Sequence, residues 1–300
     1  MPQPSPLRVP TGKNDMQIQN APSMLRNKYY NPHVLAIGIC PAIQDKVYMD
    51  LITLLIVCPL VFLAGLVDSI AGGGGLISLP AYMIAGLPAH AALGTNKLSS
   101  AIGAMVATFR MARGGYIMMR LAIPAAIGAL VGSAVGARLA LLTPAGVFQI
   151  LLIVALPIVA FFVLRKRTLD VPEDAEISPR RQVVIVAAVS LLVGGYDGFY
   201  GPGTGTFMLI AFTALAKLPV KDASGEVRVA NLASNVAALV TFLSSGVVWI
   251  GLGLTAAAFS ILGNYIGSGL VMKDGTKIVR PIIVVVLAML FVKVIWDLVA

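Results

Sequence analysis

Two glycine-rich stretches, each following an aspartate between apolar runs, are the part of the sequence best suited to binding chemistry. Glycine runs within apolar surroundings leave backbone N–H groups without intrahelical partners, which is costly in lipid unless they line a wet cavity. At the start of a half-helix such amides bind an anion. The alternatives are a surface turn or close helix packing, but recurrence after an aspartate favours the anion site. Its predicted backbone comprises Gly72, Gly73, Gly74, Gly75, Gly201, Gly203, Thr204 and Gly205.

Five polar side chains accompany these stretches. Asn96 and Asn231 can donate neutral hydrogen bonds to an anion, and Lys97 can either neutralise it or extend to the membrane interface. Asp68 and Asp197 are ionisable groups in apolar surroundings, so each either carries a coupling proton or caps a helix. Lys97 aligns with Leu232 in the second half and therefore has no cationic counterpart there.

The motifs of enzymes and cofactor proteins are missing from the sequence. The two histidines, His33 and His90, form no metal cluster, and Gly72 to Gly75 lack the Lys-Ser/Thr that completes a phosphate-binding loop. We predict no metal, no cofactor and no enzymatic activity.

The composition is that of a membrane protein. Hydrophobic residues make up 58% and charged residues only 12%, and the mean hydropathy is +0.90. Soluble domains carry about 25% charged residues, so most of this surface faces lipid. The 22 Lys and Arg against 13 Asp and Glu lie in short clusters between apolar runs, which indicates topology-setting loops rather than nucleic-acid binding.

About ten apolar segments follow Leu51, which predicts an all-α, polytopic membrane protein of eight to ten hydrophobic segments. Full-length spans are predicted at Leu51 to Val67, Leu121 to Leu142, Val147 to Leu164, Val247 to Val271 and Ile282 to Val299. Short or broken segments are predicted at Leu76 to Ala85, Val183 to Val193 and Phe207 to Ala216, and polar helices around Ala91 to Phe109 and Ala230 to Ser245.

Charge and composition divide the chain into four parts. Residues 1–48 form a proline-containing tail, and Met49 is a candidate start of the mature protein. A first transmembrane repeat covers 49–164, a basic loop 165–182 and a second repeat 183–300. By the positive-inside rule this loop and the one containing Arg110, Arg113 and Arg120 are cytoplasmic.

The two repeats carry matching landmarks in the same order and at a nearly constant separation. Asp68 matches Asp197, Leu87-Pro88 matches Leu218-Pro219, and Asn96 matches Asn231. With five segments per half, the second copy must enter the membrane with opposite polarity, which predicts inverted repeats. We therefore expect the two glycine stretches to meet near mid-membrane.

The landmarks also resemble a known family. The run Gly65-Leu66-Val67-Asp68-Ser69-Ile70-Ala71-Gly72-Gly73-Gly74-Gly75, with Gly94-Thr95-Asn96-Lys97 downstream, is similar to the sulfite exporter TauE/SafE family over about Leu51 to Ala300. The resemblance implies a permease of about eight spans that moves sulfite, sulfoacetate or other organosulfonates across bacterial plasma membranes. The tail before Met49 has no place in that pattern.

The function predicted from the sequence is secondary transport of a small anion by alternating access, with export favoured and a proton or the membrane potential as energy source. An anion channel and a membrane scaffold without transport activity are the alternatives. The expected partners are the lipid bilayer and the anion, with protons, and no nucleic acid.

Overall fold

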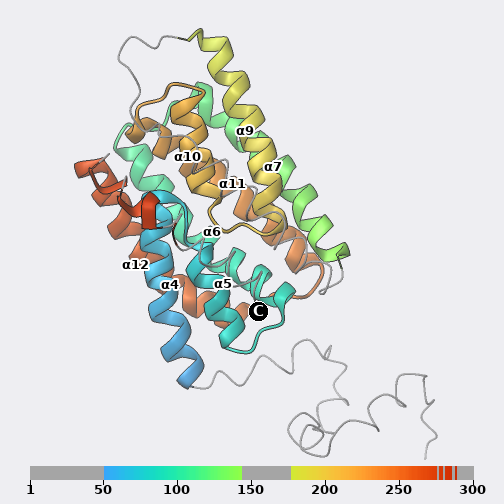
Figure 1. The fold of residues 1–300 in the computed structure, drawn as a ribbon. Coiled ribbons are helices and arrows are strands. Elements are labelled where there is room, and N and C mark those ends of the chain that lie inside the picture. Colours follow the sequence, from blue (N-terminus) through green and yellow to red (C-terminus); the bar gives the residue numbers. More distant parts are fainter. Residues whose placement is uncertain (1–50, 144–176, 276, 280, 286–287, 289–300) are drawn as a thin grey trace, which may run out of the picture. The chain divides into compact units, whose positions relative to one another are not determined.

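The computed structural model describes residues 51–143, 177–275, 277–279, 281–285 and 288, and all regular structure within them is helical. The predicted tail, the span Val147 to Leu164, most of the basic loop and most of the last span lie outside the described residues. Figure 1 shows the helices α4 (Leu51–Ala71), α5 (Gly75–Ile84), α6 (Ala89–Arg113), α7 (Met119–Leu142), α9 (Pro179–Phe199), α10 (Thr204–Ala214), α11 (Val220–Ser244) and α12 (Ile250–Asp274).

Five of these helices, α4, α7, α9, α11 and α12, are long and apolar enough to cross a membrane. Helices α5 and α10 have only 10 and 11 residues. At that length a helix cannot cross a hydrocarbon core, which needs about 20 residues. The described part of the chain is therefore an all-helical, multi-pass membrane protein that also contains two half-length helices.

Glycine backbone conformations end the helices on either side of the predicted site. Gly72, which follows α4, has φ +77°, and its N–H donates to Asp68 O at 2.6 Å. Gly201 and Gly203, between α9 and α10, have φ +103° and +80°. Glycine takes such angles without a Cβ penalty, so each long helix can break sharply before its short partner begins.

Helix lengths repeat in the two halves: 21, 10, 25 and 24 residues for α4 to α7, and 21, 11, 25 and 25 for α9 to α12. The prediction of a short segment at Val183 to Val193 is wrong, because α9 continues through Gly194 and Gly195 to Phe199. The polar helix expected from Ala230 begins earlier, at Val220 directly after Pro219.

Small residues bring the long helices into backbone contact. A Cβ on Gly132 of α7 would lie 2.0 Å from Leu191 O of α9, and one on Gly263 of α12 would lie 2.2 Å from Phe62 O of α4. Glycine is thus required for the close packing of both pairs, as small-residue interfaces allow in membrane bundles. At Gly194, where a Cβ would lie 2.9 Å from Ala129 Cα, the same packing explains why glycine does not break α9.

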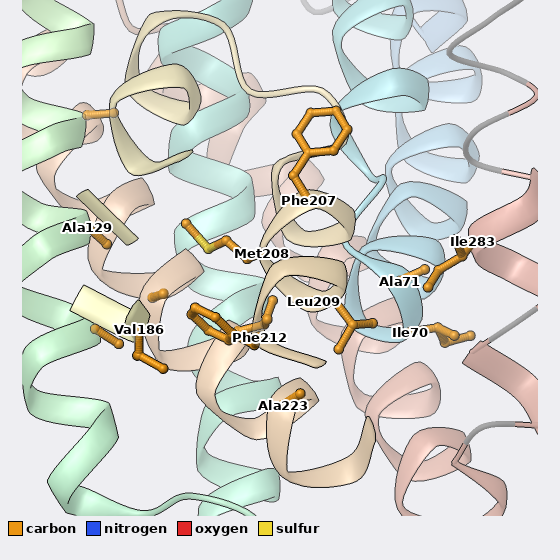
Figure 2. Close-up of a cluster of buried hydrophobic side chains, with 14 of the residues drawn as sticks. Ile70, Ala71, Ala129, Val186, Phe207, Met208, Leu209, Phe212, Ala223 and Ile283 are labelled. Carbon is orange, nitrogen blue, oxygen red and sulfur yellow. The ribbon is translucent and has the colours of Figure 1, made fainter. Parts of the chain in front are cut away.

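Helix α10 is anchored in the apolar core. Figure 2 shows Met208, Leu209 and Phe212 of this helix among buried side chains that include Val186 of α9 and Ile70 at the end of α4. Met208 and Phe212 are fully buried. This core holds the start of α10 beside the end of α4 and so positions the glycine stretches.

Candidate functional site

The two glycine stretches meet, as the sequence predicts, although they belong to opposite halves of the chain. The Gly205 N–H donates to Gly72 O at 3.1 Å. A Cβ on Gly72 would lie only 2.1 Å from Gly205 Cα, so the backbones touch without room for a side chain. The hydroxyl of Thr206 also donates to Ala71 O. The broken ends of the two halves therefore form one junction.

Two buried ion pairs flank this junction, and each joins the two halves. Lys97 Nζ of α6 lies 2.6 Å from Asp197 Oδ2 of α9, and Arg228 Nη1 of α11 lies 2.9 Å from Asp68 Oδ2 of α4. Both cationic side chains are 2% exposed. Removing one partner of either pair would leave a buried charge unpaired, which is strongly destabilising.

The two carboxylates differ in their surroundings. Asp197 accepts a second hydrogen bond from the Ser234 hydroxyl, and its side chain is 6% exposed. The Asp68 side chain is 17% exposed. Asp68 is therefore the more accessible of the two carboxylates.

A small polar pocket lies between the ion pairs. Its volume of about 20 Å³ admits one or two water molecules but not a sulfur oxyanion, so the pocket must widen before such an anion can bind. Its lining consists of Asp68, Gly72, Gly75, Asn96, Lys97, Ser100, Asp197, Gly201, Thr204, Asn231 and Asn235.

Most of the predicted site residues line this pocket. Gly73, Gly74, Gly203 and Gly205 do not, although Gly205 contacts Gly72 directly. Among the amides expected to bind an anion, that of Thr204 donates to Gly201 O at 3.2 Å and that of Gly205 to Gly72 O. An anion bound by either of these two amides must therefore replace an existing backbone hydrogen bond.

The side-chain amides are held by neighbours one helical turn away. Asn231 Oδ1 accepts from Asn235 Nδ2, and Asn96 Oδ1 accepts from the Ser100 hydroxyl at 3.4 Å. Both contacts use the amide oxygen. They orient the Asn96 and Asn231 side chains while leaving their NH₂ groups as the donors suited to an anion.

Sequence reasoning missed Arg228. The alignment of Asn96 with Asn231 placed Leu232 opposite Lys97, but α6 and α11 begin directly after the matched prolines Pro88 and Pro219. Lys97 follows Pro88 by the same interval as Arg228 follows Pro219, so Arg228 is the counterpart of Lys97 and the assignment of Leu232 is wrong. An alignment of the two halves on Pro88 and Pro219 would have identified Arg228 from the sequence.

His90 lies in the first turn of α6 with Nε2 3.0 Å from Ala140 O. It does not line the pocket.

Helices broken at glycine, with buried charges where the broken ends meet, are typical of secondary membrane transporters. The family model for the sulfite exporter TauE/SafE matches residues 57–294, and the chain belongs to this family of membrane transporters.

Relatives carry consistent names. A Sinorhizobium protein named "Probable membrane transporter protein ORF9" is 37% identical over 79% of this chain and 90% of its own length. A Haemophilus influenzae "Probable membrane transporter protein" is 34% identical over 79% and 92%. The Escherichia coli K12 "Probable membrane transporter protein YfcA" is 35% identical over 78% and 87%. No solved structure matches the chain significantly.

Proposed function

We propose that the protein is a secondary transporter that carries a small anion, sulfite or an organosulfonate, by alternating access across a bacterial plasma membrane. The family supports a transporter role for the chain. The observation that carries the proposal is the pair of buried cations, Lys97 and Arg228, each held by a carboxylate of the opposite half.

The proposed architecture is a pair of inverted repeats, α4 to α7 and α9 to α12. Two observations support it besides the matched helix lengths. Helix packing is reciprocal, since α12 packs on α4 and α6 while α7 packs on α9 and α11. The ion pairs are reciprocal too, because each half supplies one cation and one carboxylate. Two such halves can rock about a fixed central site.

The basic residues support the proposed orientation. Arg110 and Arg113 end α6, and Arg120 begins α7. Arg120 also donates to Gln182 in the first turn of α9 at 2.8 Å, which places the starts of α7 and α9 together. By the positive-inside rule this end of the bundle is cytoplasmic.

In the proposed mechanism the anion takes the place of the carboxylates on the two cations. Lys97 and Arg228 supply the charge, and the NH₂ groups of Asn96 and Asn231 donate hydrogen bonds. An ionised carboxylate beside an anion is repulsive. Asp68 and Asp197 therefore take up protons as the anion binds, which couples anion movement to proton movement.

Flux measurements in proteoliposomes test this function. We expect saturable, pH-sensitive uptake of sulfite or a sulfonate and little uptake of chloride. An unsaturated conductance would identify a channel instead. A lack of flux for every anion tested would favour a scaffold.

Replacing either asparagine in the pocket should weaken anion binding. Asn96→Ala and Asn231→Ala each remove one hydrogen bond to a charged ligand, so we expect the dissociation constant to rise about tenfold or more. Calorimetry on the purified protein measures this. Thr255→Ala serves as control, because that hydroxyl donates to Gly251 O within α12. Unchanged affinity in both asparagine variants would place the anion elsewhere.

Replacing the aspartates should remove the pH dependence of anion binding. In the wild type we expect binding to strengthen as the pH falls, because the proposed mechanism adds protons to Asp68 and Asp197 when the anion binds. Asp68→Asn and Asp197→Asn mimic the neutral form, so we expect a flatter profile in each. A sulfonate, whose own charge is constant between pH 5 and 8, is the suitable ligand. Wild-type pH dependence in both variants would contradict proton coupling at these residues.

A further inference from the structure

A second polar pocket lies on the other side of Asp68, between α4, α5, α6 and α12. It shares Asp68 and Ser100 with the first pocket. We call it the α12 pocket. Its lining consists of Val61, Ala64, Gly65, Asp68, Gly74, Ser78, Ser100, Ser260 and Asn264. The proposed anion transport does not use its polar residues on α5 and α12.

Asn264 lines this pocket and carries an unpaired oxygen. Its Nδ2 donates to Ser260 O at 3.0 Å and to Ser260 Oγ at 3.3 Å. Turning the amide over would place two carbonyl oxygens together, so these contacts fix its orientation. The Oδ1 atom is buried and has no hydrogen-bond partner among the described residues, and the whole residue is 2% exposed. An unpaired buried acceptor is costly unless something binds it.

The other polar groups of the α12 pocket also present oxygen. Ser78 Oγ donates to Gly74 O at 3.1 Å, which uses its proton and leaves its lone pairs. Ser260 Oγ accepts from Asn264, and the Asp68 carboxylate adds a negative charge. Carboxylate, amide and hydroxyl oxygens around one small space are the ligands that hard cations prefer.

We propose that the α12 pocket binds a sodium ion next to Asp68. Divalent cations are disfavoured, because the pocket contains a single carboxylate and Arg228 already pairs with it. Its volume of about 10 Å³ leaves room for a single particle about the size of a water molecule, and sodium is the smaller of the two common monovalent cations. Transporters with broken helices place coupling-ion sites at such junctions.

The sodium site and the anion site share Asp68, so sodium binding affects anion binding; this inference rests on the proposed function. Asp68 lines both pockets and holds Arg228 at 2.9 Å. A sodium ion on the Asp68 carboxylate takes the place of the coupling proton proposed there: it offsets the negative charge and weakens its attraction for Arg228, which leaves the guanidinium free for the anion. Asp197 differs, because Ser234 and Lys97 both donate to it.

Thermal unfolding of the purified full chain without any anion substrate tests the site directly. Sodium, potassium and choline chloride are compared at equal ionic strength and constant pH. We expect saturating sodium to raise the unfolding midpoint by about 4 °C or more over choline, and potassium to have little effect. Equal midpoints in sodium and potassium would overturn the proposal, and this comparison needs no variant.

Two variants locate the ion. Ser260→Ala and Asn264→Ala each remove one proposed ligand, so we expect at least a tenfold weaker apparent sodium affinity. Ser268→Ala is the matched control, since this buried serine is also on α12 but donates to Tyr265 O and does not line the pocket. Wild-type sodium affinity in Ser260→Ala would overturn the assignment. Because no anion is present, loss of the sodium effect and loss of anion flux are separate outcomes.

Discussion

The variant Lys97→Met should lose anion binding and a large part of its stability. Asp197 would remain buried with only the Ser234 hydroxyl in place of the 2.6 Å contact to Lys97 Nζ. Leaving one partner of a buried ion pair uncompensated costs about 3–5 kcal/mol. Equilibrium unfolding in mixed micelles measures the loss.

The double variant Lys97→Met, Asp197→Asn separates stability from function. Neutralising both partners removes the unpaired charge, so most of the lost free energy of unfolding should return, as buried pairs replaced by neutral groups are often tolerated. Anion binding should stay absent, because the cation is missing. Wild-type stability in the single variant, or restored binding in the double variant, would contradict the role assigned to this pair.

The variant Gly72→Ala should prevent the two halves from closing. Its Cβ would lie 2.1 Å from Gly205 Cα and 2.6 Å from Thr206 N, and these backbone atoms cannot turn away as a side chain can. We expect a loss above about 4 kcal/mol, the range of severe core disruption. The yield of monodisperse protein and its unfolding midpoint measure the effect.

Gly86→Ala is the matched control for this substitution. Gly86 has φ +90°, close to the +77° of Gly72, but an added Cβ there would meet nothing within 4 Å. Its cost should be the backbone strain alone, about 1–2 kcal/mol. Similar losses in the two variants would show that strain, rather than the contact between the halves, makes Gly72 necessary.

Sequence patterns predicted much of this fold because membrane spans and helix breaks depend mainly on the residues of the segment itself. Long apolar runs predicted the membrane class and most of the spans, and the glycine stretches predicted the breaks after α4 and α9. The same signal failed at Gly194 and Gly195, where a local pattern cannot distinguish a helix break from a close helix contact. In the structure, Ala129 of α7 packs against this part of α9.

The candidate site was harder to predict because its charges pair over long distances. Asp68 and Arg228 are 160 residues apart, and Lys97 and Asp197 are 100 apart. The sequence marked Asp68, Lys97 and Asp197 as unusual within apolar segments, but it could not show which charges meet. Arg228 was overlooked because the two halves were aligned on Asn96 and Asn231, which places Leu232 opposite Lys97. Aligning the starts of α6 and α11 instead places Arg228 there. The oxygen cluster around Asn264 depends on tertiary packing and has no local signature.

The crossed ion pairs have an electrical consequence. Two positive and two negative side chains form a cluster whose formal charges sum to zero. A single uncompensated charge carried across the membrane would change the energy by about 2.3 kcal/mol for every 100 mV of potential. In the empty protein a uniform field therefore exerts no net force on these four groups. The voltage dependence of a transport cycle is then set by the charges of the ions that enter and leave.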